Sequence, residues 1–246
     1  KILTGERLSS LDAFRGLTIA AMTLVNNPGS WKYVFSPLRH AEWHGWTPTD
    51  LVFPFFLFIV GVSVSLSFSK KIEQGIEKHS LLLKILKRTL ILFALGILLA
   101  LIPRFNFATL RIPGVLQRIA LCYLFSSLIF LGSGTKGRAA VAFSLLAIYW
   151  LMMKLIPVPG FGPGVLDYEG NLCGYLDLKL LSGHLYKPEF DPEGILSTIP
   201  AVSTSLLGVL TGDWLRTSRK ILEKTAGVFG AGILFIALGL LLHPFF

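Results

Sequence analysis

Charged residues are scarce in this chain of 246 residues, at 15% of the total, whereas soluble domains carry about 25%. This scarcity argues against a water-soluble fold. Cysteine is also rare: Cys122 and Cys173 are too few for a disulfide framework. Hydrophobic residues make up 53% of the chain and the mean hydropathy is +0.66, which excludes intrinsic disorder. The remaining class is a polytopic membrane protein.

Long apolar runs predict how many times the chain crosses the membrane. A membrane-spanning helix needs about 20 predominantly apolar residues. The candidate runs are 11–27, 49–69, 85–103, 114–132, 139–156, 195–215 and 225–243. The sequence therefore predicts an all-α transmembrane helix bundle of about seven spans, which forms a single domain over residues 1–246.

Positive charge is distributed unevenly between the connections. The formal net charge is +9, which in a soluble protein would indicate nucleic-acid binding, but membrane proteins gather Lys and Arg in cytoplasmic loops. Fifteen of the 23 Lys and Arg residues fall in segments 1–15, 70–88, 133–138 and 216–224. This bias predicts a cytoplasmic N-terminus and no nucleic-acid partner. It also predicts outward-facing loops at 28–48, 104–113 and 157–194.

The segment from His40 to Asp50 holds the densest group of residues suited to chemistry. Thr47 can cap a helix, Pro48 suits the first helical position, and Asp50 stands where a capping-box acid is found. Capping alone would explain Asp50. The alternative is that Asp50 pairs with a histidine, because a carboxylate at the membrane boundary is costly without a partner.

His40 and His44 are four residues apart, a spacing that on a helix raises a metal hypothesis. Gly45 argues against a helix there, and no third ligand is close in sequence, so no metal is expected. Two interpretations stay open for His40: a catalytic or substrate-binding residue, or a histidine that only sits at the membrane interface.

Other charged residues lie at the ends of the predicted spans. Asp12 and Arg15 are three apart and can neutralise each other. Arg118 falls inside a span, where it needs an acidic or phosphate partner. Asp191 is expected to cap a helix that starts at Pro192.

Segment 157–194 is long and rich in glycine, proline and aromatic residues. Loops of this length without secondary structure are usually functional or disordered. The aromatic content predicts an ordered cover over a site at the outward face.

Several motifs occur together in one order along the chain. They are Leu8-Ser-Ser-Leu-Asp-Ala-Phe-Arg-Gly16, Val25-Asn26, His40-Ala-x-Trp-x-Gly-x-Thr-x-x-Asp50-Leu-Val-Phe-Pro, Arg111-Ile-Pro-Gly-Val-Leu-Gln-Arg118 and Asp191-Pro-Glu-Gly-Ile-Leu-Ser-Thr198. In these motifs the chain resembles the heparan-α-glucosaminide N-acetyltransferase family. The resemblance implies a membrane enzyme that moves acetyl from cytosolic acetyl-CoA to the amine of a glucosamine residue on the far side. It also implies that helices of the family's domain are missing beyond residue 246.

The resemblance also implies site residues. His40 matches the family's catalytic histidine and Asn26 an asparagine near its active centre, while Asp50 is expected to orient His40. A base is needed because an ammonium has no lone pair, and a histidine can take its proton or briefly carry the acetyl group. Four cations are expected to bind acetyl-CoA: Arg15, Lys84, Arg88 and Arg118. Asp191, Glu193 and Trp43 are expected to meet the amino sugar.

Two other functions share these features. An amino-sugar transporter would also place polar residues in the bundle, and an O-acyltransferase of envelope glycans would use the same histidine on a hydroxyl. The expected surroundings are the lipid bilayer, specifically a bacterial inner membrane, with a homodimer as a further assembly.

Overall fold

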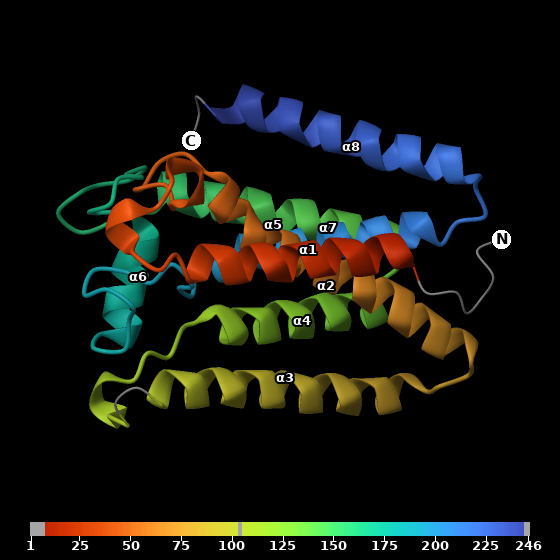
Figure 1. Ribbon diagram of the computed structural model, residues 1–246, viewed down its shortest axis with the longest axis horizontal. Coiled ribbons are helices and arrows are strands. Elements are labelled where there is room, and N and C mark those ends of the chain that lie inside the picture. Colours follow the sequence, from red (N-terminus) through yellow and green to blue (C-terminus); the bar gives the residue numbers. More distant parts are fainter. Residues whose placement is uncertain (1–7, 103–104, 244–246) are drawn as a thin grey trace.

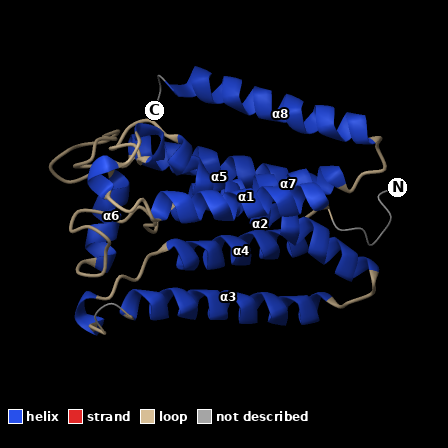
Figure 2. Ribbon diagram, in the orientation of Figure 1, coloured by secondary structure: helices blue, strands red, loops and turns tan. Residues whose placement is uncertain are grey.

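The computed structural model describes residues 8–102 and 105–243, and within these ranges it is helical, with no β-strand (Figure 2). Each predicted apolar run forms one long helix. These helices are α1 (Ser9–Asn26), α2 (Pro48–Glu73), α3 (Lys78–Leu101), α4 (Val115–Gly132), α5 (Thr135–Leu155), α7 (Thr198–Leu215) and α8 (Ile221–Leu242). Lys1, Arg7 and Arg104, which enter the charge count, lie outside the described residues.

Among the described helices, four are long and apolar enough to cross a membrane: α2, α4, α5 and α8. The all-α prediction is confirmed, but the expectation of about seven spans is not. Helix α3 carries Lys84, Lys87 and Arg88 within its length, and α1 carries Asp12 and Arg15. These charges lower the hydropathy of both helices.

Consecutive long helices run in alternating directions, so the connections gather at two ends of the bundle (Figure 1). The segments between α1 and α2, between α3 and α4, and between α5 and α7 meet at one end. Hydrogen bonds link them; among these, Trp43 Nε1 donates to the Leu166 carbonyl over 2.8 Å, and the Ile112 N–H donates to the His184 carbonyl over 3.0 Å. The three loops predicted to share one face therefore do share one end, called here the loop end.

Helix α7 forms the centre of the packing, against α2, α4 and α5. Small residues allow α2 and α7 to approach closely. A Cβ atom added to Gly208 would lie 2.1 Å from the carbonyl oxygen of Phe58, and one added to Gly61 would lie 1.8 Å from that of Ser205. A serine links α7 to α5, since Ser203 Oγ donates to the Ala142 carbonyl over 2.9 Å.

We predict that Gly208→Ala destabilises the protein by about 1–3 kcal/mol, because the added methyl group must push two backbones apart. Gly230→Ala is the matched control, since a Cβ there meets nothing within 4 Å. Thermal unfolding of the purified protein in detergent compares the two variants. Equal melting temperatures for both would contradict the close contact between α2 and α7.

Two predictions about segment 157–194 were wrong. The first is that this segment lacks secondary structure, because residues Leu172–Leu181 form helix α6, which Figure 1 shows lying across the loop end. The second is that a helix starts at Pro192. Helix α7 begins at Thr198, because Asp191 binds Arg111 and tight turns, rather than helix, follow it.

Candidate active site

The predicted pairing of Asp50 with a histidine is present, and the partner is His40. Nδ1 of His40 lies 2.6 Å from Oδ1 of Asp50, so the Nδ1–H group donates a hydrogen bond to an ionised Asp50. The ring nitrogen Nε2 has no hydrogen-bond partner among the described residues, and the His40 side chain is 58% exposed. This geometry leaves the Nε2 atom exposed, on the side of the ring away from Asp50.

Asp50 holds its position because it also begins α2. Its Oδ2 atom accepts hydrogen bonds from the backbone N–H of Thr47 over 2.8 Å and of Ala41 over 3.1 Å. Pro48 is the first residue of the helix, as the spacing predicts. Both interpretations of Asp50 are therefore correct, since one carboxylate caps the helix and orients the imidazole.

The loop that carries His40 is anchored by Trp43, which was predicted to be a site residue. The Trp43 ring packs edge-on against Tyr168 and Phe190, with ring centroids 5.1 and 5.2 Å apart. His44 faces Asp167, with Nε2 3.6 Å from Oδ1, and does not pair with His40. Segment 157–194 therefore orders the histidine loop, as expected of a cover.

A cavity of about 810 Å³ opens beside this loop. Its walls mix aromatic and polar side chains, and we call it the polar cavity. Its lining includes Trp43, His44, Trp46, Tyr149, Asn171, Cys173, Asp177, Asp191 and Ser197. The volume falls within the range of about 300–1,000 Å³ typical of small-molecule sites.

A buried cluster of charges stands next to the polar cavity. Arg111 binds both carboxylate oxygens of Asp191, with Nε 2.8 Å from Oδ2 and Nη2 2.7 Å from Oδ1, and it also contacts Glu193. Burial alone raises the pKa of Asp191. The hydrogen bonds from Arg111 and from the backbone N–H groups of Glu193 and Tyr186 outweigh burial and hold that pKa below its usual value.

Arg118 was expected to have an acidic or phosphate partner. Its hydrogen bonds go to neutral oxygens, while the carboxylate of Glu193 acts on it through charge alone. Its Nη2 donates to the Gly194 carbonyl over 3.1 Å and to Ser197 Oγ. The side chain is 8% exposed, and its Nε has no hydrogen-bond partner among the described residues. One donor of this buried guanidinium is therefore unsatisfied.

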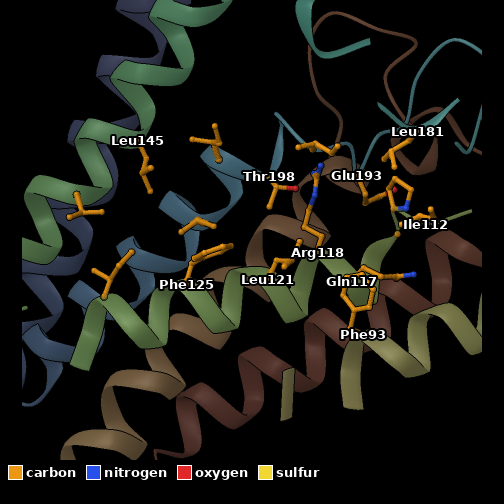
Figure 3. Close-up of a pocket in the computed structure, with 17 residues that line it drawn as sticks. Phe93, Ile112, Gln117, Arg118, Leu121, Phe125, Leu145, Leu181, Glu193 and Thr198 are labelled. Carbon is orange, nitrogen blue, oxygen red and sulfur yellow. The ribbon is translucent and has the colours of Figure 1, made fainter. Parts of the chain in front are cut away.

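Arg118 stands at the polar end of a second cavity, of about 550 Å³, between α3, α4, α5 and α7 (Figure 3). We call it the apolar cavity, because most of its lining is aliphatic or aromatic. The lining includes Phe93, Leu121, Phe125, Ile129, Val141, Leu145, Ile199 and Val202, with Gln117, Arg118, Glu193 and Thr198 as polar members.

One buried acid was missed by the sequence analysis. Asp177 on α6 is 1% exposed, and its Oδ1 accepts the backbone N–H of Ile195 over 2.9 Å. Burial raises the pKa of this carboxyl above its usual value. A Cβ on Gly194 would lie 1.8 Å from Asp177 Oδ2, so Asp177 supports the turn whose carbonyl binds Arg118. With α6 unpredicted, no sequence signal indicated this burial.

The four residues expected to bind acetyl-CoA do not form one group. Arg118 lies near the start of α4 at the loop end, whereas α3, with Lys84 and Arg88, begins at the opposite end (Figure 1). Arg15 pairs with Asp12 over 3.0 Å, as predicted, and donates to Ser63 Oγ over 3.0 Å. Asn26, the last residue of α1, is exposed at the loop end.

The fold and site define an all-α integral membrane protein that presents a histidine–carboxylate pair at one end of its bundle. A family model described as heparan-α-glucosaminide N-acetyltransferase, catalytic, matches residues 7–241, and the chain belongs to this family. Human heparan-α-glucosaminide N-acetyltransferase is 32% identical over 286 residues, which cover 94% of this chain and 43% of that protein. The mouse protein of the same name is 31% identical over 261 residues, which cover 86% of this chain and 39% of the mouse protein. The chain thus spans less than half the length of these relatives.

Proposed function

We propose that the chain is a membrane acetyltransferase that moves acetyl from acetyl-CoA to the amine of a glucosamine-type sugar. The observation that carries the proposal is the His40–Asp50 pair at the start of α2, in a chain that belongs to an N-acetyltransferase family. His40 Nε2 takes a proton from the sugar ammonium, and the free amine attacks the acetyl carbonyl. A C–N bond forms and the C–S bond breaks. The nitrogen gives its second proton to the CoA thiolate, and His40 releases the first proton to water.

His40 serves equally well in a two-step route. In that route Nε2 attacks the thioester first, and the amine then removes the acetyl group from the imidazole. Asp50 holds the ring in one orientation for either route, because it fixes Nδ1. Asn26 is proposed to polarise the acetyl carbonyl.

The donor is proposed to enter from the cytoplasmic side, opposite the loop end. Lys84 and Arg88 stand one turn apart on α3, and neither forms an ion pair with a carboxylate among the described residues. Such unpaired cations suit the phosphates of CoA. Arg15 is proposed to join them. Arg118 lies at the other end of the bundle, so we assign it to the acceptor rather than to the donor.

The sugar is proposed to bind at the loop end, in the polar cavity, which Trp43 lines. Glu193 lines the adjacent apolar cavity and is proposed to meet the sugar from there. Asp191 contributes through Arg111, since both of its oxygens are already engaged. The positive-charge bias supports a cytoplasmic N-terminus, with the loop end on the far side. This topology needs all seven long helices to span, in a membrane that we propose to be a bacterial inner membrane.

Incubation of membranes that contain the protein with labelled acetyl-CoA and a panel of amino sugars tests the proposal. We expect label in an amide product. Release of unmodified sugar across the membrane, with all label left on CoA, would indicate a transporter. A base-labile ester would indicate an O-acyltransferase.

We predict that Asp50→Asn lowers kcat by about 10²-fold, because asparagine can still cap α2 but no longer stabilises a protonated His40. Its melting temperature should stay near that of the wild type. The measurement is acetyl transfer at saturating acceptor, alongside thermal unfolding. A fully active Asp50→Asn protein would remove Asp50 from the proposed mechanism.

A further inference from the structure

The polar cavity and the apolar cavity lie on two sides of one short segment, residues 191–199. Asp191 and Ser197 line the polar cavity, whereas Glu193 and Thr198 line the apolar cavity. A site with a polar compartment next to an apolar one matches a ligand that has a polar head and a hydrocarbon chain.

The apolar cavity lies among helices of the membrane domain. Its lining comes in part from α4 and α5, both of which can cross a membrane. Phe125 and Ile195 in that lining are 44% and 46% exposed, so the cavity opens on the outer surface of the bundle. A chain drawn from the bilayer can therefore enter sideways, and aliphatic walls favour hydrocarbon over water.

Arg118 lines the apolar cavity (Figure 3) and is bonded to Ser197, which lines the polar cavity. Its Nη2 is bonded to Gly194 and Ser197 in the dividing segment, while its buried Nε has no partner in the described part of the chain. A buried donor without an acceptor is unfavourable, so the site favours a ligand that brings an oxygen to this point. The linkage between a sugar and its alkyl chain carries such an oxygen.

We propose that the acceptor is a lipid-linked amino sugar, whose sugar occupies the polar cavity and whose alkyl chain occupies the apolar cavity. The linkage oxygen accepts the Arg118 Nε–H. This inference rests on the proposed function, because it names the class of acceptor for that reaction.

The test compares glucosamine with hexyl and octyl glucosaminides, each below its aggregation concentration, using labelled acetyl-CoA. Each buried methylene contributes to binding, so KM for the octyl compound is expected to be at least about tenfold below that for glucosamine. Partition into the bilayer lowers an apparent KM in the same way, so a variant that fills the cavity is decisive.

Leu145→Trp places a large ring in the apolar cavity, whereas Leu146→Trp changes the neighbouring residue, which is 38% exposed and does not line the cavity. We expect Leu145→Trp to raise the octyl KM at least fivefold and to leave glucosamine turnover unchanged, which also shows that the variant folds. Leu146→Trp should change neither. Leu121→Trp is a second filling variant, should Leu145→Trp lose all turnover.

Different outcomes would overturn the lipid-linked acceptor and the proposed function. If glucosamine is acetylated but the preference for a chain is absent, or survives both filling variants, the lipid-linked acceptor is overturned and the proposed function stands. If no amino sugar is acetylated by the wild type, the proposed function fails and this inference fails with it.

Discussion

Replacing His40 by alanine is expected to lower the rate of acetyl transfer by about 10²–10⁴-fold, the usual contribution of a general base. The Asp50 carboxylate, which holds Nδ1 of His40, does not replace the imidazole as a base, because backbone N–H groups already bind it. The measurement is initial rate with labelled acetyl-CoA and saturating acceptor. The fold should survive, because the imidazole is largely exposed.

His79→Ala is the matched control, because His79 is exposed on α3, which begins at the end of the bundle opposite His40. Its rate should equal that of the wild type. Full activity in a correctly folded His40→Ala protein would overturn the proposed mechanism. Trapping of labelled acetyl on wild-type protein, but not on His40→Ala, would select the two-step route.

The second large effect is expected from Arg111→Ala, which should destabilise the protein by about 3–5 kcal/mol. The side chain of Asp191 is 0% exposed, so loss of its bidentate partner leaves a buried carboxylate without compensation. The turn that follows Asp191 should loosen with it, since the same carboxylate accepts the backbone N–H of Glu193 over 2.9 Å. Thermal unfolding in detergent measures the change.

The sign of the pH dependence follows from the lowered pKa of Asp191. The ionised Asp191 contributes fully to the free energy of unfolding at pH values above the ordinary aspartate pKa of about 3.9. This contribution is lost as the pH falls through the lower pKa of Asp191 in the folded state. Arg111→Ala should therefore lose its deficit in strongly acidic buffer, where Asp191 is protonated in both proteins.

Arg216→Ala removes a partly exposed ion pair with Glu73 and serves as the control, with an expected loss of at most about 1 kcal/mol. The double variant Arg111→Ala/Asp191→Ala should recover part of the stability lost in Arg111→Ala, because no buried charge is then left alone. An Arg111→Ala protein as stable as the Arg216→Ala control would show that the cluster does not support the loop end.

Local patterns in the sequence predicted the helices and the pairing of a histidine with Asp50. Apolar runs indicate a helix wherever they are long enough, and the start of α2 depends on Thr47, Pro48 and Asp50, which are neighbours in the chain. His40 is ten residues from Asp50, close enough for a single loop to return it to the helix start. Alternation of the helices then placed the three predicted loops at one end.

The errors came from contacts between distant residues. Asp191 has every local feature of a helix cap, yet its carboxylate binds Arg111, 80 residues away, and α7 begins later. Arg118 was assigned an acidic or phosphate partner from its charge. The fold brings the charge of Glu193 near it, but gives its hydrogen bonds to Gly194 and Ser197. Burial of Asp177 depends on how α6 lies across the loop end, which no local pattern reports.

The sequence by itself determined that this is a helical membrane protein, which loops share an end, and that His40 and Asp50 stand together. These features depend on hydropathy and on spacing within a few turns of chain. Only the tertiary structure decided which partners the buried charges bind, and where segment 191–199 separates a polar from an apolar cavity. Cavities and buried ion pairs form between helices that are far apart in the chain, so their geometry arises only when those helices pack.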